Sequence, residues 1–315
     1  MSSETEGGMD GIRKIEAGSA LSWFTRAVDV GGRQARGLFA AAALGVLAMG
    51  AAAMVAALLL AVLVAAGLSP GEKPDIGRSM LVALPIILLF SLLMPVFGGG
   101  MQQVLHQAEA GRPVGAGDIF AGFVGGRFGS LAGLAILPLA GLALTLANYH
   151  VFGGPEYFAQ YVAMLEEMTR GGQPVPPEVR SPALLFLVGM AINAVQTVLQ
   201  LITVPLVQLS GRGTLGAIAD GFRMMARNPG AVLTALALGL AAALVLAIVL
   251  AIGLMILALL AGLVPVLGVP LMLVLAFALM VVLFVIYHGI GYYAWRDQFG
   301  APGRAPPAAP AQLEV

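Results

Sequence analysis

The sequence predicts an all-α, polytopic transmembrane helical bundle of about six spans. Its main support is that five long segments carry no Asp, Glu, Lys or Arg and are rich in Leu, Ala, Val, Ile and Gly. About 20 apolar residues span a bilayer as a helix, so each of the first four segments fits one span, and the last, with 68 residues, fits two or three. The five charge-free segments are 37–71, 79–108, 128–155, 181–211 and 228–295.

The overall composition supports this fold class. Hydrophobic residues make up 59% of the chain and charged residues 10%, against roughly 25% charged in a soluble domain, and the mean hydropathy is +0.95. The 16 basic and 16 acidic residues all lie outside the apolar segments. The absence of fixed charge from the membrane interior argues against proton or sodium coupling through buried charged residues. Because the chain has no Cys, disulfides, thiolate metal sites and cysteine nucleophiles are excluded.

We expect three parts along the chain. Residues 1–36 form a cytoplasmic N-terminal segment with an amphipathic helix; they show no signal-peptide pattern, so the first span is expected to target the chain. Residues 37–295 form the six-span transmembrane domain, and residues 296–315 form a Pro- and Ala-rich disordered cytoplasmic tail. The expected spans are 38–67, 80–104, 129–150, 182–208, 231–260 and 270–293.

The longest charge-free segment is interrupted near its middle by Pro265, Gly268 and Pro270, which favours a tight hairpin between two helices. Its length also permits three spans. The basic residues favour two, because a six-span arrangement places twelve Lys and Arg on the side of the termini and only four on the other side. The sequence therefore predicts that both termini lie in the cytoplasm.

A loose repeat precedes the pairs of spans: three short stretches place apolar residues three to four positions apart, with Arg nearby. This pattern is typical of a helix on the membrane surface whose Arg side chains reach lipid phosphates. The architecture would then be three copies of an interfacial helix plus a helical hairpin, with Asp118 as N-cap of the second stretch. The apolar residues of the stretches are Leu21, Phe24 and Val28, then Ile119, Phe120, Phe123 and Val124, then Ile218, Phe222 and Met225.

Five residues are expected to contact the membrane interface. Phe123 and Phe222 would face acyl chains or the bundle, while Arg127 and Arg227 would reach phosphates. Trp295, with its neighbouring tyrosines, is placed to anchor the end of the last span at the interface.

The outer loop 151–180 is the one sizeable polar segment between spans. It predicts a helix between Pro155 and Gly171, with Tyr157 beginning a row of apolar residues on one side. This helix either rests on the membrane surface or acts as a lid over a cavity between spans.

A stripe of polar residues marks the fourth span. Asn193, Gln196, Gln200 and Thr203 follow helical spacing and share one face near the middle of the membrane. Such side chains seek partners in hydrocarbon, so they serve either as interhelical hydrogen-bonding groups or as the polar wall of a substrate or lipid-headgroup cavity.

The second span has two prolines, Pro85 and Pro95, followed by three consecutive glycines at 98–100. Kinked, glycine-rich helices occur at transport sites, and glycine also permits close helix packing. Packing is the favoured interpretation.

The sequence offers no catalytic constellation, so no enzymatic activity, cofactor or metal is expected. Asp220-Gly221 followed by Ala226-Arg227 starts like the CDP-alcohol phosphotransferase signature, but the spacing is wrong and no further acidic residue occurs before Asp297. The three histidines lie near span ends on different helices.

Two segments resemble a known family: 108–114, which leads into 117–123, and 293–300 at the exit of the last span. Both resemble an uncharacterised family of bacterial multi-pass inner-membrane proteins that is distantly similar to the membrane domain attached to some glycerophosphodiester phosphodiesterases. The resemblance extends over most of residues 18–300 and implies a six-helix inner-membrane protein. It supplies no catalytic residues, and since the phosphodiesterase domain is absent here, that activity does not transfer.

The expected function follows from these observations. The leading hypothesis is a non-enzymatic inner-membrane protein that binds lipid or a membrane partner in envelope upkeep, and the alternative is a passive or partner-driven transporter of a neutral or lipid-like solute. The expected partners are membrane lipids, with a membrane-protein partner or a second copy of the chain left open, and no nucleic acid.

Overall fold

The computed structural model describes residues 11–30, 34–67, 76–263 and 265–300, and within these ranges the chain is helical and contains no strand. The predicted disordered tail begins at residue 296, but the last helix continues to Phe299, so this start is corrected. The part of the tail from residue 301 onward lies outside the described residues. Along the chain the helices are α1 (Ser19–Asp29), α2 (Ala35–Gly67), α3 (Ile76–Glu109), η1 (Ala116–Phe123), α4 (Phe128–Gly133), α5 (Ile136–Asn148), η2 (Tyr149–Gly153), α6 (Tyr157–Thr169), α7 (Pro182–Gln208), α8 (Thr214–Arg227), α9 (Pro229–Leu263) and α10 (Pro265–Phe299).

Six helical segments in the described ranges are long and apolar enough to cross a membrane, which confirms the prediction of an all-α polytopic bundle. The third consists of three pieces, α4, α5 and η2. The predicted break near Pro265 is confirmed, because α9 ends at Leu263 and α10 begins at Pro265, whereas Pro270 lies inside α10. The spans cover Ala35–Val62, Leu84–Glu109, Phe128–Gly153, Pro182–Gln208, Pro229–Gly253 and Pro270–Phe299.

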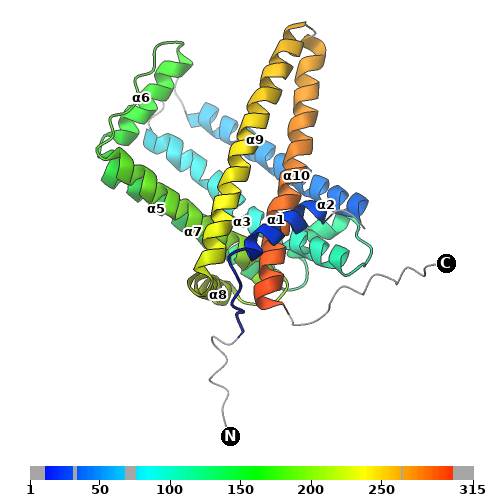
Figure 1. Ribbon diagram of the computed structural model, residues 1–315. Helices are drawn as coiled ribbons and strands as arrows, with labels where there is room; N and C mark the ends of the chain where they lie inside the picture. The colour runs from blue at the N-terminus through cyan, green and yellow to red at the C-terminus, as the bar shows by residue number, and fades with distance from the viewer. Residues whose placement is uncertain (1–10, 31–33, 68–75, 264, 301–315) are drawn as a thin grey trace, which may run out of the picture.

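Both ends of the described chain meet at one end of the bundle, which we call the terminal end (Figure 1). The backbone N–H of Arg13 donates to the carbonyl of Gln298 at 3.0 Å. Asn228, at the start of α9, donates to the Arg13 carbonyl and to Gln298 Oε1, both at 3.1 Å. An even number of spans has this consequence, so the shared end agrees with six crossings.

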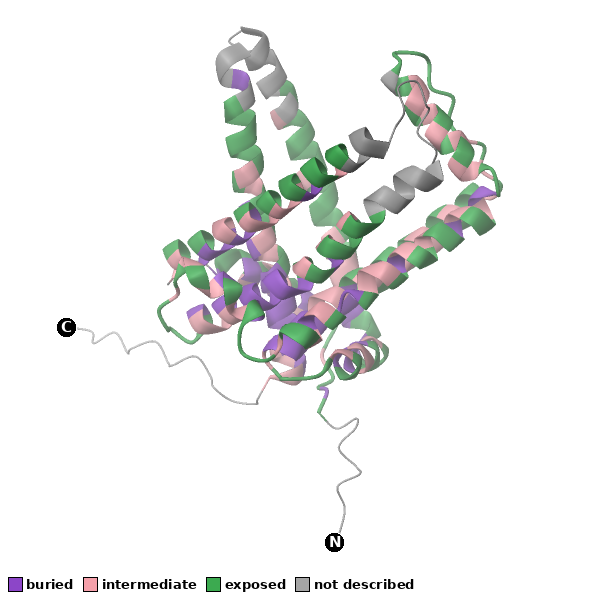
Figure 2. Ribbon diagram, turned by 180° about the vertical axis from the view of Figure 1, so that it is seen from behind, coloured by how far each residue is buried: buried purple, intermediate pink, exposed green. Residues whose placement is uncertain are grey.

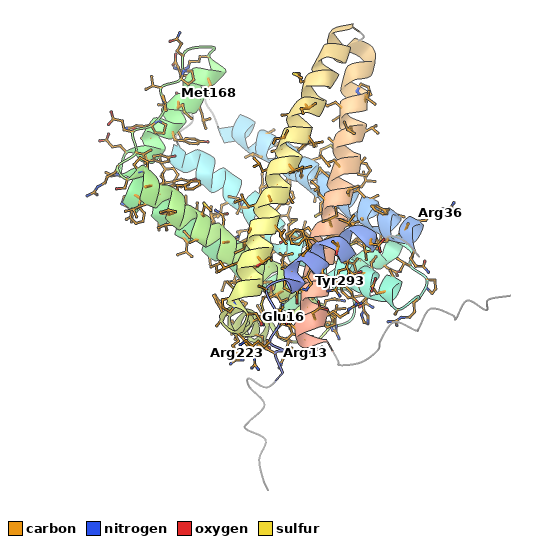
Figure 3. All side chains as sticks on the ribbon, viewed as in Figure 1. Arg13, Glu16, Arg36, Met168, Arg223 and Tyr293 are labelled. Carbon is orange, nitrogen blue, oxygen red and sulfur yellow. The ribbon has the colours of Figure 1, made fainter. Side chains whose placement is uncertain are left out.

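The core lies toward the terminal end, where the buried residues gather (Figure 2). The helical pairs α2–α3, α5–α7 and α9–α10 come together there, and α9–α10 stands apart from α5 and α7 toward the opposite end, which we call the far end (Figures 1 and 2). Figure 3 shows Arg13, Glu16 and Arg223 at the terminal end and Met168 of α6 at the far end. Outside the core, Leu240, Leu244 and many other large apolar side chains of the spans are exposed, as is usual for surfaces that face lipid.

Each pair of spans is preceded by a short element, namely α1, η1 or α8. α1 and α8 are α-helices, but the second element is a 3₁₀-helix that begins at Ala116. The expectation that Asp118 is its N-cap is wrong. Asp118 is the third residue of the helix, and its Oδ2 accepts a hydrogen bond from the N–H of Gly115 at 2.8 Å.

The glycine segment of α3 serves close packing. A Cβ atom at Gly100 would lie 1.7 Å from the carbonyl oxygen of Ile119 in η1, and one at Gly122 would lie 2.0 Å from the carbonyl oxygen of Val96. The two backbones therefore touch at positions where any larger residue would collide. The neighbouring Gly99 faces the Leu131 side chain, with 2.6 Å between the Cβ position and Cδ1. These contacts support the packing interpretation of this segment.

The loop 151–180 contains the expected helix, α6. Its first residues stack on the end of the preceding span, because the Tyr157 ring lies parallel to those of Tyr149 and Tyr161 at 5.2 and 6.4 Å. Burial raises the pKa of Tyr157, and the neighbouring Tyr149 and Tyr161 raise it further, so its hydroxyl stays protonated at neutral pH.

Candidate functional site

A large apolar groove separates α7 from α9 and has a volume of about 1790 Å³. α1 borders it with Phe24 and Val28, and the residues around Tyr149 and Val179 border it near the far end. Most of the side chains between these borders are Leu, Ala, Val and Ile from α7, α9 and α10. The groove thus presents hydrocarbon along the bundle, with polar groups on one wall.

Two polar side chains on the α7 wall, Asn193 and Thr197, lie one helical turn apart, and Gly189 lies one turn before them. The Asn193 amide donates to the Gly189 carbonyl at 2.9 Å. On the facing α5, Asn148 is 5% exposed and donates from Nδ2 to the Leu185 carbonyl at 3.0 Å, while its Oδ1 has no hydrogen-bond partner among the described residues. The wall of the groove near Asn148 therefore contains one buried hydrogen-bond acceptor without a donor.

Of the predicted polar stripe, only Asn193 lines this groove. Gln196 packs on α5, where a Cβ at Gly141 would lie 1.9 Å from its Oε1. Thr203 is fully buried against α8 near Gly221. Gln200 is half-buried on the same helix. Asn193, Gln196 and Thr203 face different neighbours, so the stripe forms no common cavity wall in the structure.

Thr197 is not among the residues predicted from the sequence, because the predicted stripe follows Asn193, Gln196, Gln200 and Thr203. A spacing of four from Gly189 through Asn193 to Thr197 was the available signal. That spacing follows a slightly different line around the helix, and the groove lies along it.

A smaller pocket of about 240 Å³ lies beyond the far-end border of the groove, between η2, the start of α6 and residues 178–180. We call it the far pocket. It contains Glu156, Gln160, Glu178 and Arg180, and Val179 borders both the pocket and the groove. The polar pocket and the apolar groove therefore adjoin.

A network of polar and aromatic side chains joins α1, α3 and α10 at the terminal end. Glu109 accepts hydrogen bonds from the Tyr293 hydroxyl and from Arg296 Nη1, both at 2.7 Å. Glu109 and Tyr293 lie 184 positions apart, so this contact joins the end of α3 to the end of α10. The Arg296 and Arg26 guanidinium groups lie 5.2 and 4.6 Å from the centre of the Tyr293 ring.

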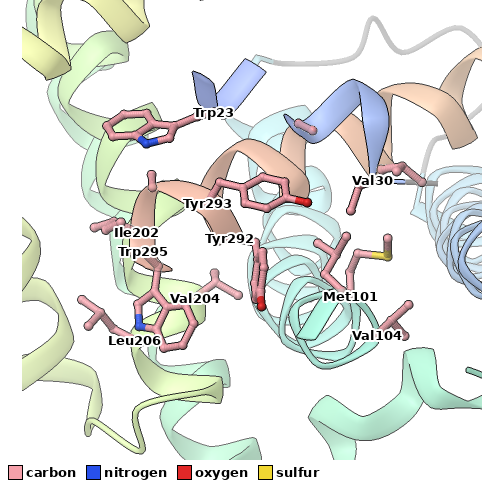
Figure 4. Packing of buried hydrophobic residues seen from close by; sticks show 14 of the residues in the cluster. Trp23, Val30, Met101, Val104, Ile202, Val204, Leu206, Tyr292, Tyr293 and Trp295 are labelled. Atoms are coloured by element: carbon pink, nitrogen blue, oxygen red, sulfur yellow. The ribbon is translucent and has the colours of Figure 1, made fainter. Parts of the chain in front are cut away.

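α1 is attached to α10 through Asp297. The Trp23 indole donates to Asp297 Oδ2 at 2.9 Å, and Arg26 forms an ion pair with the same carboxylate. Trp23 is 3% exposed and lies close to Tyr293 in the core (Figure 4). Thus α1 packs its indole into the bundle while Phe24 borders the groove.

The interpretation of Trp295 as an interfacial anchor is corrected. Trp295 is 8% exposed, and its indole donates to Ser210 Oγ at 2.9 Å; Tyr292 and Tyr293 are each 2% exposed. All three rings pack inside the bundle (Figure 4). The sequence pattern of aromatic residues at a span end does not distinguish a lipid-facing ring from one that faces another helix.

The other four expected interfacial residues lie in or next to η1 and α8, the short elements that precede the second and third pairs of spans. Phe123 and Phe222 are exposed by 37% and 50%, and the Phe123 ring also contacts Phe97 at 5.1 Å. Arg127 precedes α4, and Arg227 ends α8 with its side chain exposed. Their contact with lipid remains a prediction.

The Asp220 carboxylate forms ion pairs with two arginines and does not belong to a group of carboxylates that could hold a metal ion. Its Oδ2 lies 3.1 Å from Arg212 Nε, and its Oδ1 lies 2.9 Å from Arg223 Nη1. His288 bonds through Nδ1 to the Phe284 carbonyl at 2.9 Å. Within the described ranges no three His, Cys, Asp or Glu side chains are grouped to hold a metal ion.

Comparison of the chain with protein-family models, curated proteins and solved structures found no match.

Proposed function

We propose that this protein is a non-enzymatic integral protein of a bacterial inner membrane that binds membrane lipid in the groove between α7 and α9, in a role in envelope upkeep. The observation that carries the proposal is the continuous apolar lining of a groove of about 1790 Å³ within the membrane-spanning part of the bundle. In a bilayer, acyl chains cover such a surface, because most of it carries no polar group that water could hydrate.

α1 also contributes to the lining of the groove, through Phe24 and Val28. α1 lies across it, fixed to α10 by Trp23 and Arg26, and places Phe24 against the apolar lining. An acyl chain in the groove would therefore meet protein on several sides, which distinguishes a bound lipid from lipid on an open helix surface.

Filling the groove is expected to displace lipid. We expect Ala194→Trp in α7 and Ala241→Trp in α9 to reduce the lipid retained per protein after detergent extraction, since both positions line the groove. Native mass spectrometry measures the bound lipid directly. Ala51→Trp, an exposed position on α2 outside the groove, is the matched control and should retain the wild-type amount. Equal retention in all three variants would contradict lipid binding in the groove.

The alternative function is passive or partner-driven movement of a neutral or lipid-like solute. Asn193 and Thr197 favour it, because they place hydrogen-bonding groups along an otherwise apolar wall. Under this alternative, vesicles containing the protein would move a fluorescent neutral lipid between leaflets, and Thr197→Val would slow that movement. The lipid-binding proposal expects no such movement.

The proposed orientation places the terminal end in the cytoplasm. Reporter fusions after Gly300 and near Gly211 are then expected to behave as cytoplasmic, and fusions near Pro174 in the α6–α7 connection as periplasmic. The basic residues supply the physical reason, with twelve on the terminal side and four on the other. A periplasmic signal at Gly300 would reverse this orientation.

A further inference from the structure

The far pocket and the apolar groove form two adjoining parts of one surface. Val179 borders both, so a ligand with a polar head in the pocket and an apolar tail in the groove would pass this residue. The pocket lies where the span Phe128–Gly153 ends and α7 begins. In a bilayer the ends of membrane spans are expected near the lipid headgroups. Figure 1 shows this region at the junction of α5 and α6.

The backbone holds the pocket in place. The N–H groups of Arg180 and Ser181 donate to the carbonyls of Gly153 and Phe152 at 3.1 and 2.9 Å. The N–H of Glu178 donates to Gln160 Oε1 of α6 at 2.7 Å. Gly154 turns the chain with a φ of 111°, a conformation that favours glycine. Residues 178–181 are thus fixed to η2 and α6 around the pocket.

The charged side chains of the pocket are exposed and form no ion pair with one another within the described part of the chain. They are the carboxylates of Glu156 and Glu178 and the guanidinium of Arg180. The arginines of the terminal end differ, since Arg26 and Arg296 each pair with a carboxylate. The far pocket therefore offers both signs of charge to a ligand.

A second observation lies directly along the groove from this pocket. Asn148 is 95% buried, because only 5% of it is exposed, and its Oδ1 has no hydrogen-bond partner among the described residues. An acceptor without a donor is costly in an apolar surrounding. Acyl chains carry no donor, so this acceptor would need the headgroup or a water molecule as its partner.

We propose that the far pocket binds the headgroup of an aminophospholipid, with its acyl chains in the groove. Arg180 binds the phosphate, and Glu156 and Glu178 bind the primary ammonium, whose N–H groups are hydrogen-bond donors. A quaternary ammonium has no such donors, and an anionic headgroup without a cation meets two carboxylates. The proposal rests on the lipid-binding function proposed above and adds the headgroup class.

The test uses the full-length protein in nanodiscs whose phosphatidylethanolamine, phosphatidylcholine and phosphatidylglycerol carry matched oleoyl chains. Native mass spectrometry then gives the lipids that stay bound. We expect the wild-type protein to enrich phosphatidylethanolamine about fivefold over phosphatidylcholine, the factor expected for one hydrogen bond that the quaternary ammonium cannot donate. Glu156→Gln combined with Glu178→Gln should remove this enrichment but keep the total amount of bound lipid.

Two further variants separate the contributions. Arg180→Gln should weaken binding of phosphatidylethanolamine and phosphatidylcholine alike, because both carry the phosphate. Glu167→Gln makes the same charge change on α6 outside the pocket and should leave the enrichment unchanged. Loss of the phosphatidylethanolamine enrichment in the Glu167→Gln control would overturn the assignment to the pocket.

The outcomes also separate this proposal from the one on which it rests. Equal retention of all three lipids by the wild-type protein, together with lipid loss in Ala194→Trp, would overturn the headgroup proposal and leave the groove proposal intact. Enrichment that survives in the double Gln variant would overturn the headgroup proposal as well. Enrichment that the double Gln variant removes and Ala194→Trp leaves unchanged would support a headgroup site without the groove.

Discussion

Replacing Gly100 with alanine is expected to destabilise the bundle by about 1 to 3 kcal/mol, the range seen when a well-packed core is overfilled. The added Cβ would lie 1.7 Å from the carbonyl oxygen of Ile119, so η1 must move away from α3. Gly122→Ala should have a similar effect from the other side, since its Cβ would lie 2.0 Å from the Val96 carbonyl oxygen. A backbone oxygen cannot rotate aside as a flexible side chain can.

The measurement is thermal unfolding in detergent, followed by the loss of monodisperse protein on size exclusion. Gly50→Ala is the control, because Gly50 lies within α2 and has no neighbouring atom within 4 Å of the added Cβ. It should leave the melting temperature unchanged or raise it slightly. A Gly100→Ala protein as stable as this control would mean that η1 is not seated against α3.

Trp23→Ala is expected to cost about 3 kcal/mol and to loosen α1 from the bundle. The indole is 3% exposed, and its N–H bonds to Asp297, so the change opens a cavity and leaves the carboxylate with one partner fewer. Trp23→Phe keeps part of the apolar contact but removes the hydrogen bond and some ring volume, so it should cost less than Trp23→Ala, about 1 to 2 kcal/mol.

Limited trypsin digestion reports on α1 itself. A loosened α1 should be cut faster after Arg26, which pairs with Asp297 in the native protein. Thr25→Ala changes an exposed residue of the same helix and should be cut at the wild-type rate. If Trp23→Ala and Thr25→Ala are cut equally slowly, the indole does not hold α1 in place.

The spans could be predicted because the apolar composition that a membrane span requires is a local property of the sequence. The helix α7 has the predicted bounds, 182–208, and the break at Pro265 falls where a residue without an N–H can begin a helix. The helix in the outer loop follows from the same kind of local signal, with Pro155 before it and Gly171, at a φ of 74°, after it. Each of these signals lies within a few residues of the element that it predicts.

The site was less predictable, because helical periodicity gives the faces of a helix without naming their partners. Asn193 and Gln196 are neighbours on the same stripe, yet one lines the groove and the other packs on Gly141. Small rotations of α7 decide between these outcomes, and they depend on side chains of α5, α8 and α9. The sequence of α7 does not specify which side chains of α5, α8 and α9 contact it.

By itself the sequence determined that the protein is a helical membrane protein with six spans, since the cost of placing charge and unpaired backbone groups in hydrocarbon acts on each segment separately. Only the tertiary structure decided that Trp295 packs inside the bundle, that Glu109 meets Tyr293, and that the far pocket adjoins the groove. Those contacts join residues as far as 184 positions apart for Glu109 and Tyr293. Their pairing depends on how the hairpins cross, which is settled by packing among all of them together.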